Sequence, residues 1–189
     1  LVGQGVGAEV VDADALAHEA LDDPAVREAV VARFGGGVLD AAGRVSRPAL
    51  AERVFGPDPA HVAARAGLEA EVHPWVRRRI TDQLAAARAT EAVDGRRRVA
   101  VLDVPLLVQA GWDEACDRLV VVECEARVRK ARLAARGWSP EQIAARDRAW
   151  ERPGGAAAAP EKSATVDASG DPAYTLPQVE RIWKSLPAR

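Results

Sequence analysis

The alternation of short apolar segments with amphipathic helical patterns constrains the fold of this chain more than any other feature. Segments rich in Val and Ala predict strands at residues 8–11, 99–103, 119–122 and, more weakly, 164–166. Helical patterns separate them, and the spacing is typical of βαβ units. The sequence therefore predicts an α/β protein with a parallel sheet, whose ligands bind at the carboxyl ends of the strands.

Several helices have recognisable start and stop signals. A helix over residues 24–34 opens with Pro24 and stops at a glycine run, and a shorter helix over residues 47–55 follows. A longer helix carries apolar residues every fourth position from Leu68 to Leu84, and we expect Pro74 to end or kink it at His73. Further helices are predicted by the patterns at 125–137, 139–150 and 176–186.

Charge and composition exclude several classes of partner. The 189 residues include 26 basic and 28 acidic ones, and the pI is about 6.0, so no overall field favours nucleic acid or a membrane surface. No apolar run has the length of a membrane span. Cys116 and Cys124 lack metal-ligand or CxxC spacing, which indicates reduced thiols in a cytoplasmic chain.

Two carboxylates mark the end of the first predicted strand. If the backbone stays extended, Asp12 and Asp14 lie on the same side of it, at the edge where such folds bind ligands. Carboxylates there suit a cation held against phosphates, or a general base. Alternatively, Asp14 caps the following helix and Asp12 lies in solvent. A D-x-D after an apolar strand also occurs in metal-dependent nucleotide-sugar transferases.

An ordered set of motifs makes the functional prediction more specific. The chain contains, in order, VVDADALAHEAL, RFGGGVLDAAGRVSRPALAERVF, LEAEVHPWVRRRI, VLDVPLLVQAGWDEACDRLVVVE, RLAARGWSPEQIAARDRAW and VDASGDP followed by QVERIWKSL. This set resembles the dephospho-CoA kinase family over nearly the whole chain. The most specific part is DAD followed by HP at 73–74 and DxPLL at 103–107.

The resemblance implies a P-loop kinase fold, a three-layer α/β protein with a parallel sheet, a helical substrate-binding insertion and a lid. It implies transfer of the γ-phosphoryl group of ATP, with Mg²⁺, to the ribose 3′-hydroxyl of dephospho-CoA, the last step of coenzyme A synthesis. By position, the nucleotide-kinase core would comprise residues 1–21, 97–124 and 161–189. The helical domain that binds the CoA substrate would comprise 22–96, and the lid 125–160.

The resemblance also assigns expected roles to individual residues. Asp14 would be the base for the 3′-hydroxyl, and Asp103 would have a Walker-B-like magnesium role. The expected substrate contacts are Asp12, His73, Arg77, Pro105 and Leu106. The expected lid cations for the ATP triphosphate are Arg132, Arg136 and Arg146.

Each of these roles has a plainer alternative. His73 and Asp103 can be ordinary structural residues, and Pro105 and Leu106 can be core packing. Arg129, Arg132 and Arg136 share one helical face, which could simply be solvated.

The chain departs from the family pattern in three places. It contains no G-x-x-x-x-G-K-[ST] phosphate loop, the motif whose backbone N–H groups and lysine hold the phosphates of ATP. In the family this loop lies just upstream of the point that corresponds to Leu1, so we expect the chain as given to be inactive and unstable. Gln109 stands where the family usually has Glu, and DASG at 167–170 replaces D-N-S-G.

Two alternatives remain beside the nucleotide-sugar transferase. One is a non-catalytic descendant that binds CoA-like ligands, and the other is a P-loop kinase that acts on a different small hydroxyl compound.

Overall fold

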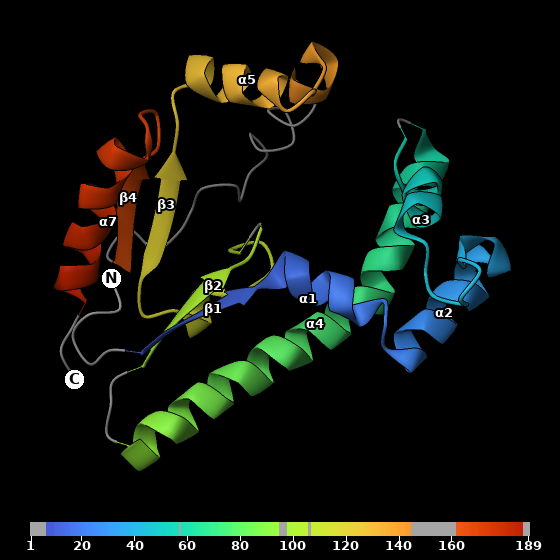
Figure 1. Ribbon diagram of the computed structural model, residues 1–189, viewed down its shortest axis with the longest axis horizontal. Helices are drawn as coiled ribbons and strands as arrows, with labels where there is room; N and C mark the ends of the chain where they lie inside the picture. Colours follow the sequence, from blue (N-terminus) through green and yellow to red (C-terminus); the bar gives the residue numbers. More distant parts are fainter. Residues whose placement is uncertain (1–6, 57, 95–97, 106, 145–161, 187–189) are drawn as a thin grey trace. The chain divides into compact units, whose positions relative to one another are not determined.

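The strands of the structure lie where the sequence predicts them. The computed structural model describes residues 7–56, 58–94, 98–105, 107–144 and 162–186 (Figure 1). Within these ranges the strands are β1 (Gly7–Asp12), β2 (Arg98–Asp103), β3 (Leu119–Glu123) and β4 (Ser163–Asp167). Each differs from its predicted bounds by at most one residue at either end, because each is a Val- or Ala-rich run bounded by polar or turn-forming residues.

The strands are parallel, as the βαβ spacing predicts, but within the described residues they form two two-stranded sheets where the sequence predicted one sheet. β1 pairs with β2 from Gly7 opposite Arg98 to Asp12 opposite Asp103. β3 pairs with β4 from Leu119 opposite Ser163 to the ends of both strands. The chain divides into two compact units, Val2–Pro105 and Leu106–Arg189, and each pair belongs to one of them.

The first unit is built on one long helix. α4 (Pro59–Asp94) contacts α1 (Ala13–Ala20), α2 (Pro24–Phe34) and α3 (Arg47–Val54), and it also contacts β2. Figure 1 shows α4 running beside β1, β2 and α1. A 3₁₀ turn, η1 (Gly36–Val38), follows α2. The buried apolar side chains of these helices form the core of the unit: Leu16, Ala20, Val26, Val30, Val38, Leu50, Val54, Val72, Val76 and Ile80.

Of the two outcomes predicted at Pro74, an end of the helix or a kink, the end does not occur, and Figure 1 shows α4 changing direction along its length. α4 continues through Pro74 without interruption, although an interior proline removes a hydrogen bond and costs about 3 kcal/mol. Val72, Val76 and Ile80 on either side of it are all buried. Full burial of such a side chain contributes roughly 1.5–3 kcal/mol, so the buried stripe outweighs the cost of the proline.

Asp23 joins the start of α2 to α4. Its Oδ1 accepts hydrogen bonds from the backbone N–H groups of Ala25 (3.0 Å) and Val26 (3.2 Å), which makes it the N-cap of α2. Its Oδ2 accepts a hydrogen bond from the indole N–H of Trp75 on α4, at 2.9 Å. The Trp75 hydrogen bond first, and then that from Val26, lower the pKa of Asp23 below its ordinary value.

We therefore expect acid to weaken this unit partly through Asp23. A carboxyl whose pKa is lowered on folding stabilises the fold above its unfolded pKa of about 3.9, and this contribution is lost as the pH falls through the folded pKa. Thermal unfolding of wild type and Asp23→Asn should show wild type more stable at about pH 6, with the difference shrinking by about pH 3. Asp22→Asn, at the exposed neighbouring carboxylate, is the control. If the stabilities of wild type and Asp23→Asn change with pH in parallel, Asp23 makes no such pH-dependent contribution to stability.

The second unit combines β3 and β4 with helices at their ends. A 3₁₀ turn, η2 (Asp113–Ala115), precedes β3, α5 (Ala126–Ala135) follows it, and α7 (Pro172–Ser185) follows β4 and packs on it. Residues 140–144 are also helical, with the Ser139 hydroxyl accepting from the N–H of Gln142. Asp171 caps α7, so this helix begins four residues before the predicted start. No helix in the described part of the chain is long and apolar enough to cross a membrane.

Lys162 has a structural role at the start of β4. Its Nζ donates hydrogen bonds to the carbonyl oxygens of Asp113 (2.9 Å) and Cys116 (3.3 Å). These contacts tie the 3₁₀ turn η2 to the β3–β4 pair. Burial raises the pKa of the nearby Cys116 thiol, which is free, as is Cys124. Both thiols are unbridged, as the sequence predicts.

Candidate active site

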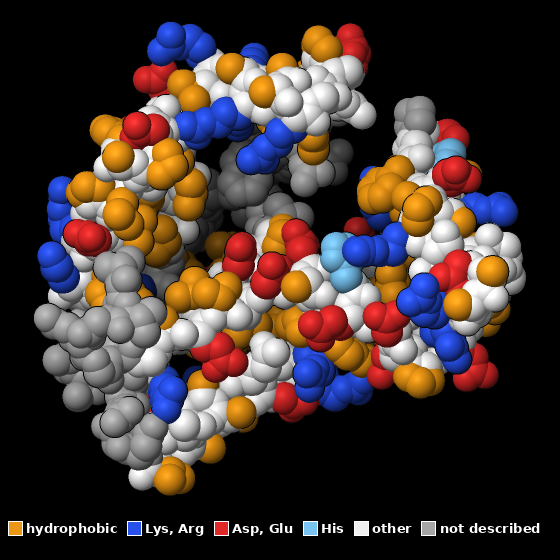
Figure 2. Space-filling view, viewed as in Figure 1, with side chains coloured by type: hydrophobic (Ala, Val, Ile, Leu, Met, Phe, Trp, Pro, Cys, Tyr) orange, Lys and Arg blue, Asp and Glu red, His pale blue; other side chains and the backbone are white. Residues whose placement is uncertain are grey.

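Acidic residues end two adjacent parallel strands. Asp12 and Asp103 are the last residues of β1 and β2, and they are partners in the strand register. Both side chains are exposed, and Asp14 is exposed two residues after Asp12, in the first turn of α1. Figure 2 shows acidic side chains gathered where β1 and β2 end and α1 begins. The carboxyl ends of adjacent parallel strands are where α/β folds bind their ligands.

The local geometry of the two aspartates differs from the predicted one. The backbone is extended at Asp12, but the helix begins at Ala13, so Asp12 and Asp14 do not lie on the same side of a strand. Asp12 is the N-cap, with its Oδ1 accepting from the N–H of Ala15 at 2.9 Å. Asp14 is therefore not the cap, and the alternative that gave it this role is also wrong. Because Asp12 satisfies the helix end, the Asp14 side chain has no capping role there.

The carboxylates do not form a complete metal site by themselves. Among the described residues, no group of three or more His, Cys, Asp or Glu side chains is arranged to hold a metal ion. Asp12 has one carboxylate oxygen in the helix cap, and Asp103 is exposed at the end of β2. Mg²⁺ commonly takes only one or two protein carboxylates and completes its shell with phosphate oxygens and water.

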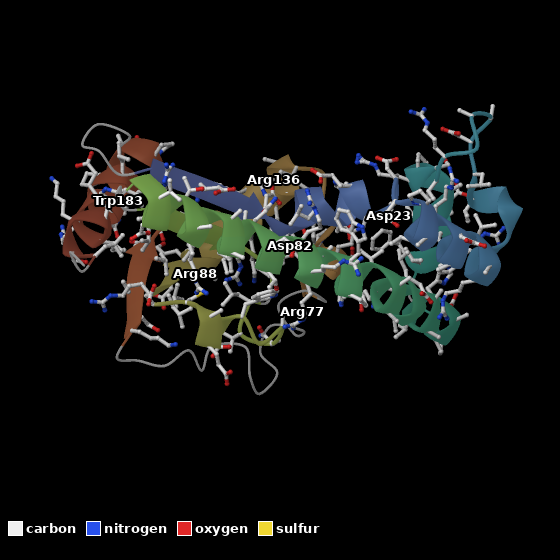
Figure 3. All side chains as sticks on the ribbon, turned by 90° about the horizontal axis from the view of Figure 1, so that it is seen from below. Asp23, Arg77, Asp82, Arg88, Arg136 and Trp183 are labelled. Atoms are coloured by element: carbon white, nitrogen blue, oxygen red, sulfur yellow. The ribbon has the colours of Figure 1, made fainter. Side chains whose placement is uncertain are left out.

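The predicted substrate contacts lie mostly in the same unit as the aspartates. His73 and Arg77 are exposed on α4, one turn apart, and α4 packs against α1. His73 lies inside the helix, which continues through Pro74. Pro105 is exposed in the turn after β2, and Leu106 lies outside the described residues. Figure 3 shows Arg77 on α4 with Asp82 and Arg88 further along the helix.

The predicted lid cations belong to the second unit. Arg136 is the C-cap residue of α5, and its side chain is exposed (Figure 3). Arg146 lies outside the described residues. Arg132 donates hydrogen bonds from its guanidinium to the backbone oxygens of Ala168 and Gly170. The structure thus gives Arg132 a contact within the protein that its helical spacing did not predict.

A polar network surrounds the loop after β4, and sequence reasoning missed it. The Asp167 carboxylate accepts hydrogen bonds from the Ser169 N–H (2.8 Å) and the Tyr174 hydroxyl (2.9 Å). The hydrogen bonds from Ser169, followed by that from Tyr174, lower the pKa of Asp167, and Asp167 in turn raises the pKa of Tyr174. Gln178 on α7 contacts both the N–H and the carbonyl oxygen of Asp167. The only sequence signal for this loop is the DASG motif.

Solved structures share this arrangement of strands and helices. The crystal structure of TT1252 from Thermus thermophilus matches with a TM-score of 0.64 and 29% identity, covering 96% of this chain and 86% of that one. Dephospho-CoA kinase from Campylobacter jejuni matches with a TM-score of 0.60 and 19% identity, covering 94% of this chain and 85% of that one. Parallel strand pairs, crossover helices and acidic strand ends therefore define an α/β protein with the P-loop kinase type of fold.

Sequence comparisons identify the family. The family model described as dephospho-CoA kinase matches residues 2–150. A dephospho-CoA kinase of Symbiobacterium thermophilum is 41% identical over 95% of this chain and 71% of its own length. One from Rhodopirellula baltica is 32% identical over 79% of this chain and 68% of its own length. The chain belongs to the dephospho-CoA kinase family, which confirms the resemblance seen in the sequence motifs.

Proposed function

We propose that the natural protein transfers the γ-phosphoryl group of ATP to the ribose 3′-hydroxyl of dephospho-CoA in the cytoplasm, with Asp14 as the general base. The observation that carries the assignment of the site is the register of Asp12 with Asp103 at the ends of β1 and β2, with Asp14 in the next turn. These positions gather negative charge at the edge where a parallel α/β fold binds its ligand. Membership of the family supports the choice of reaction.

The proposed step needs a base, a positioned phosphate chain and stabilisation of the charge on the phosphates. The Asp14 carboxylate accepts the proton of the 3′-hydroxyl as its oxygen forms a bond to the γ-phosphorus of ATP. The bond between that phosphorus and the bridging oxygen breaks, and ADP leaves with the electron pair. Most of the rate in such reactions comes from positioning and from stabilising the charge on the transferred oxygens, and the base adds about 10²- to 10⁴-fold.

Asp12 and Asp103 suit the magnesium ion that accompanies ATP. Carboxylate oxygens are the protein ligands that Mg²⁺ prefers, and a pair of them leaves room for phosphate oxygens in its shell. We propose that these two residues hold the ion, which would neutralise charge on the β- and γ-phosphates. Asp12 Oδ1 is already committed to the helix cap, so its other oxygen would serve.

The substrate contacts are proposed from α4 and the turn after β2. His73 and Arg77 lie one turn apart on α4, so they can face one ligand, and Arg77 can pair with the diphosphate of dephospho-CoA. Pro105 and Leu106 would contact its apolar parts. Arg136 and Arg146 are proposed to approach the triphosphate, as predicted for lid residues.

Binding measurements test the substrate side of this proposal. We expect Arg77→Ala in the full-length natural protein to weaken dephospho-CoA binding by about tenfold, the effect of losing one charge-assisted contact. Isothermal titration calorimetry with dephospho-CoA measures the change. Arg88→Ala is the matched control, because Arg88 is exposed on the same helix and has no proposed role. Equal affinities for wild type and Arg77→Ala would remove Arg77 from the site.

The same titration separates the proposed kinase from the non-catalytic alternative. A protein that binds dephospho-CoA and also binds ATP with Mg²⁺ supports the kinase. A protein that binds dephospho-CoA but gives no heat with ATP and Mg²⁺ would favour the non-catalytic descendant.

A further inference from the structure

The loop formed by residues 168–170 lies at the carboxyl ends of β3 and β4 and is held from several sides. The N–H of Ala168 donates to the carbonyl oxygen of Glu123, the last residue of β3, at 2.7 Å. The Ser169 hydroxyl accepts from the N–H of Glu125 at 2.8 Å. With the contacts of Asp167 to α7 described above, these bonds fix the loop against three neighbouring segments. Its position is one where parallel α/β folds bind ligands.

Arg132, in the last turn of α5, adds side-chain hydrogen bonds to the backbone of this loop. Its Nη1 donates to the backbone oxygen of Ala168 at 2.5 Å, and its Nη2 donates to that of Gly170. Nη1 also lies 3.8 Å from the Cys124 sulfur, within hydrogen-bonding distance for sulfur. The two nitrogens at the end of the guanidinium therefore span two carbonyl groups that are two residues apart in the loop.

This geometry determines what Arg132 can do. Nη1 and Nη2 each direct a donor to a loop carbonyl, so two of the five N–H donors of the guanidinium are engaged within the protein. A lysine here would have to reach both carbonyls with one nitrogen, as Lys162 does at Asp113 and Cys116, whereas Arg132 uses a separate nitrogen for each. The contact thus depends on the shape of the guanidinium as well as on its charge.

We propose that Arg132 is a positioning residue, which holds the 168–170 loop in the conformation that ATP binding requires and does not itself contact the transferred phosphoryl group. The part that concerns ATP rests on the proposed function. The part that concerns the loop stands on the hydrogen bonds of the second unit alone. This role replaces the triphosphate contact expected from the spacing of the arginines on α5.

Hydrogen exchange tests the loop directly. In the full-length natural protein without nucleotide, we expect the Ala168 and Ser169 amides to exchange about tenfold faster or more in both Arg132→Ala and Arg132→Lys, with β3, α5 and α7 unchanged. Arg127→Ala is the control, because Arg127 lies on the same helix and its exposed side chain contacts only Glu125 among the described residues. Unchanged exchange at Ala168 and Ser169, or a uniform increase across the unit, would overturn the proposal.

Kinetics then separates positioning from phosphate binding. A positioning role predicts that both Arg132 variants raise KM for ATP by about tenfold, while kcat stays within about threefold. A contact with the transferred phosphoryl group predicts instead a large fall in kcat for Arg132→Ala, partly restored by the charge of Arg132→Lys. That second pattern would overturn the proposal. If wild type transfers no phosphoryl group to dephospho-CoA, the proposed function and the ATP role of Arg132 both fail, and the exchange result decides the loop role by itself.

Discussion

Asp14→Asn in the full-length natural protein should lower kcat for phosphorylation of dephospho-CoA by about 10²- to 10⁴-fold, with KM for ATP nearly unchanged. Asn has almost the same size as Asp but cannot accept the proton of the 3′-hydroxyl at neutral pH. Because Asp12 caps α1 and Asp14 does not, the substitution leaves the helix end intact. Steady-state rates at saturating ATP and dephospho-CoA measure the effect.

A control substitution at another exposed aspartate shows whether the fall in kcat is specific to Asp14. Asp82→Asn removes an exposed negative charge from α4, in the same unit, without touching the strand ends (Figure 3). We expect it to leave kcat within about twofold of wild type, as for a surface substitution away from the reacting groups. If Asp14→Asn behaves like Asp82→Asn, Asp14 is not the base and the proton must go to another group.

The second prediction with a large effect concerns stability, and it tests the core of the first unit, which is built on α4. Ile80→Ala should lower the free energy of unfolding by about 2–5 kcal/mol, because Ile80 has 0% of its surface exposed and truncation leaves a cavity between packed helices. Such a loss is a large fraction of the about 5–15 kcal/mol that stabilises a typical protein. Urea unfolding followed by far-UV circular dichroism measures the difference.

Two further variants show whether the loss comes from the cavity. Ile80→Val removes one methylene at the same position and should cost about 0.5–1.5 kcal/mol. Val93→Ala, also on α4 but 89% exposed, should change stability by no more than about 0.5 kcal/mol. Equal effects of Ile80→Ala and Val93→Ala would mean that helix propensity, and not core packing, determines the stability of α4.

Local signals in the sequence were enough to predict the strands and most helix ends. Val-rich runs defined β2 and β3, and Pro24 with the glycine at 35 defined α2, whose C-cap Gly35 has a φ of 79°. Pro74 shows the limit of such reasoning. The local rule allows either an end or a kink there, and burial of neighbouring residues on α4 keeps the helix from ending. The competition between proline and tertiary packing cannot be judged from spacing alone.

The residues proposed for the candidate site were visible in the sequence, but their geometry was not. The D-x-D motif and the acid after the second strand were visible in the sequence, and parallel pairing explains why Asp12 and Asp103 meet. The sequence did not reveal that Asp12 would take the cap, because either aspartate is a good N-cap residue. It also did not reveal the Arg132 contact, since the two carbonyl groups lie 36 and 38 residues away in the chain.

Product analysis tests the central claim most directly. The full-length natural protein would be incubated with Mg²⁺, dephospho-CoA and ATP labelled in its γ-phosphate, and the product identified by mass spectrometry and ³¹P NMR. Our account predicts coenzyme A that carries the label on the ribose 3′-oxygen, with one ADP formed for each molecule. Dephospho-CoA that binds but remains unphosphorylated, or label that appears only as inorganic phosphate, would contradict it.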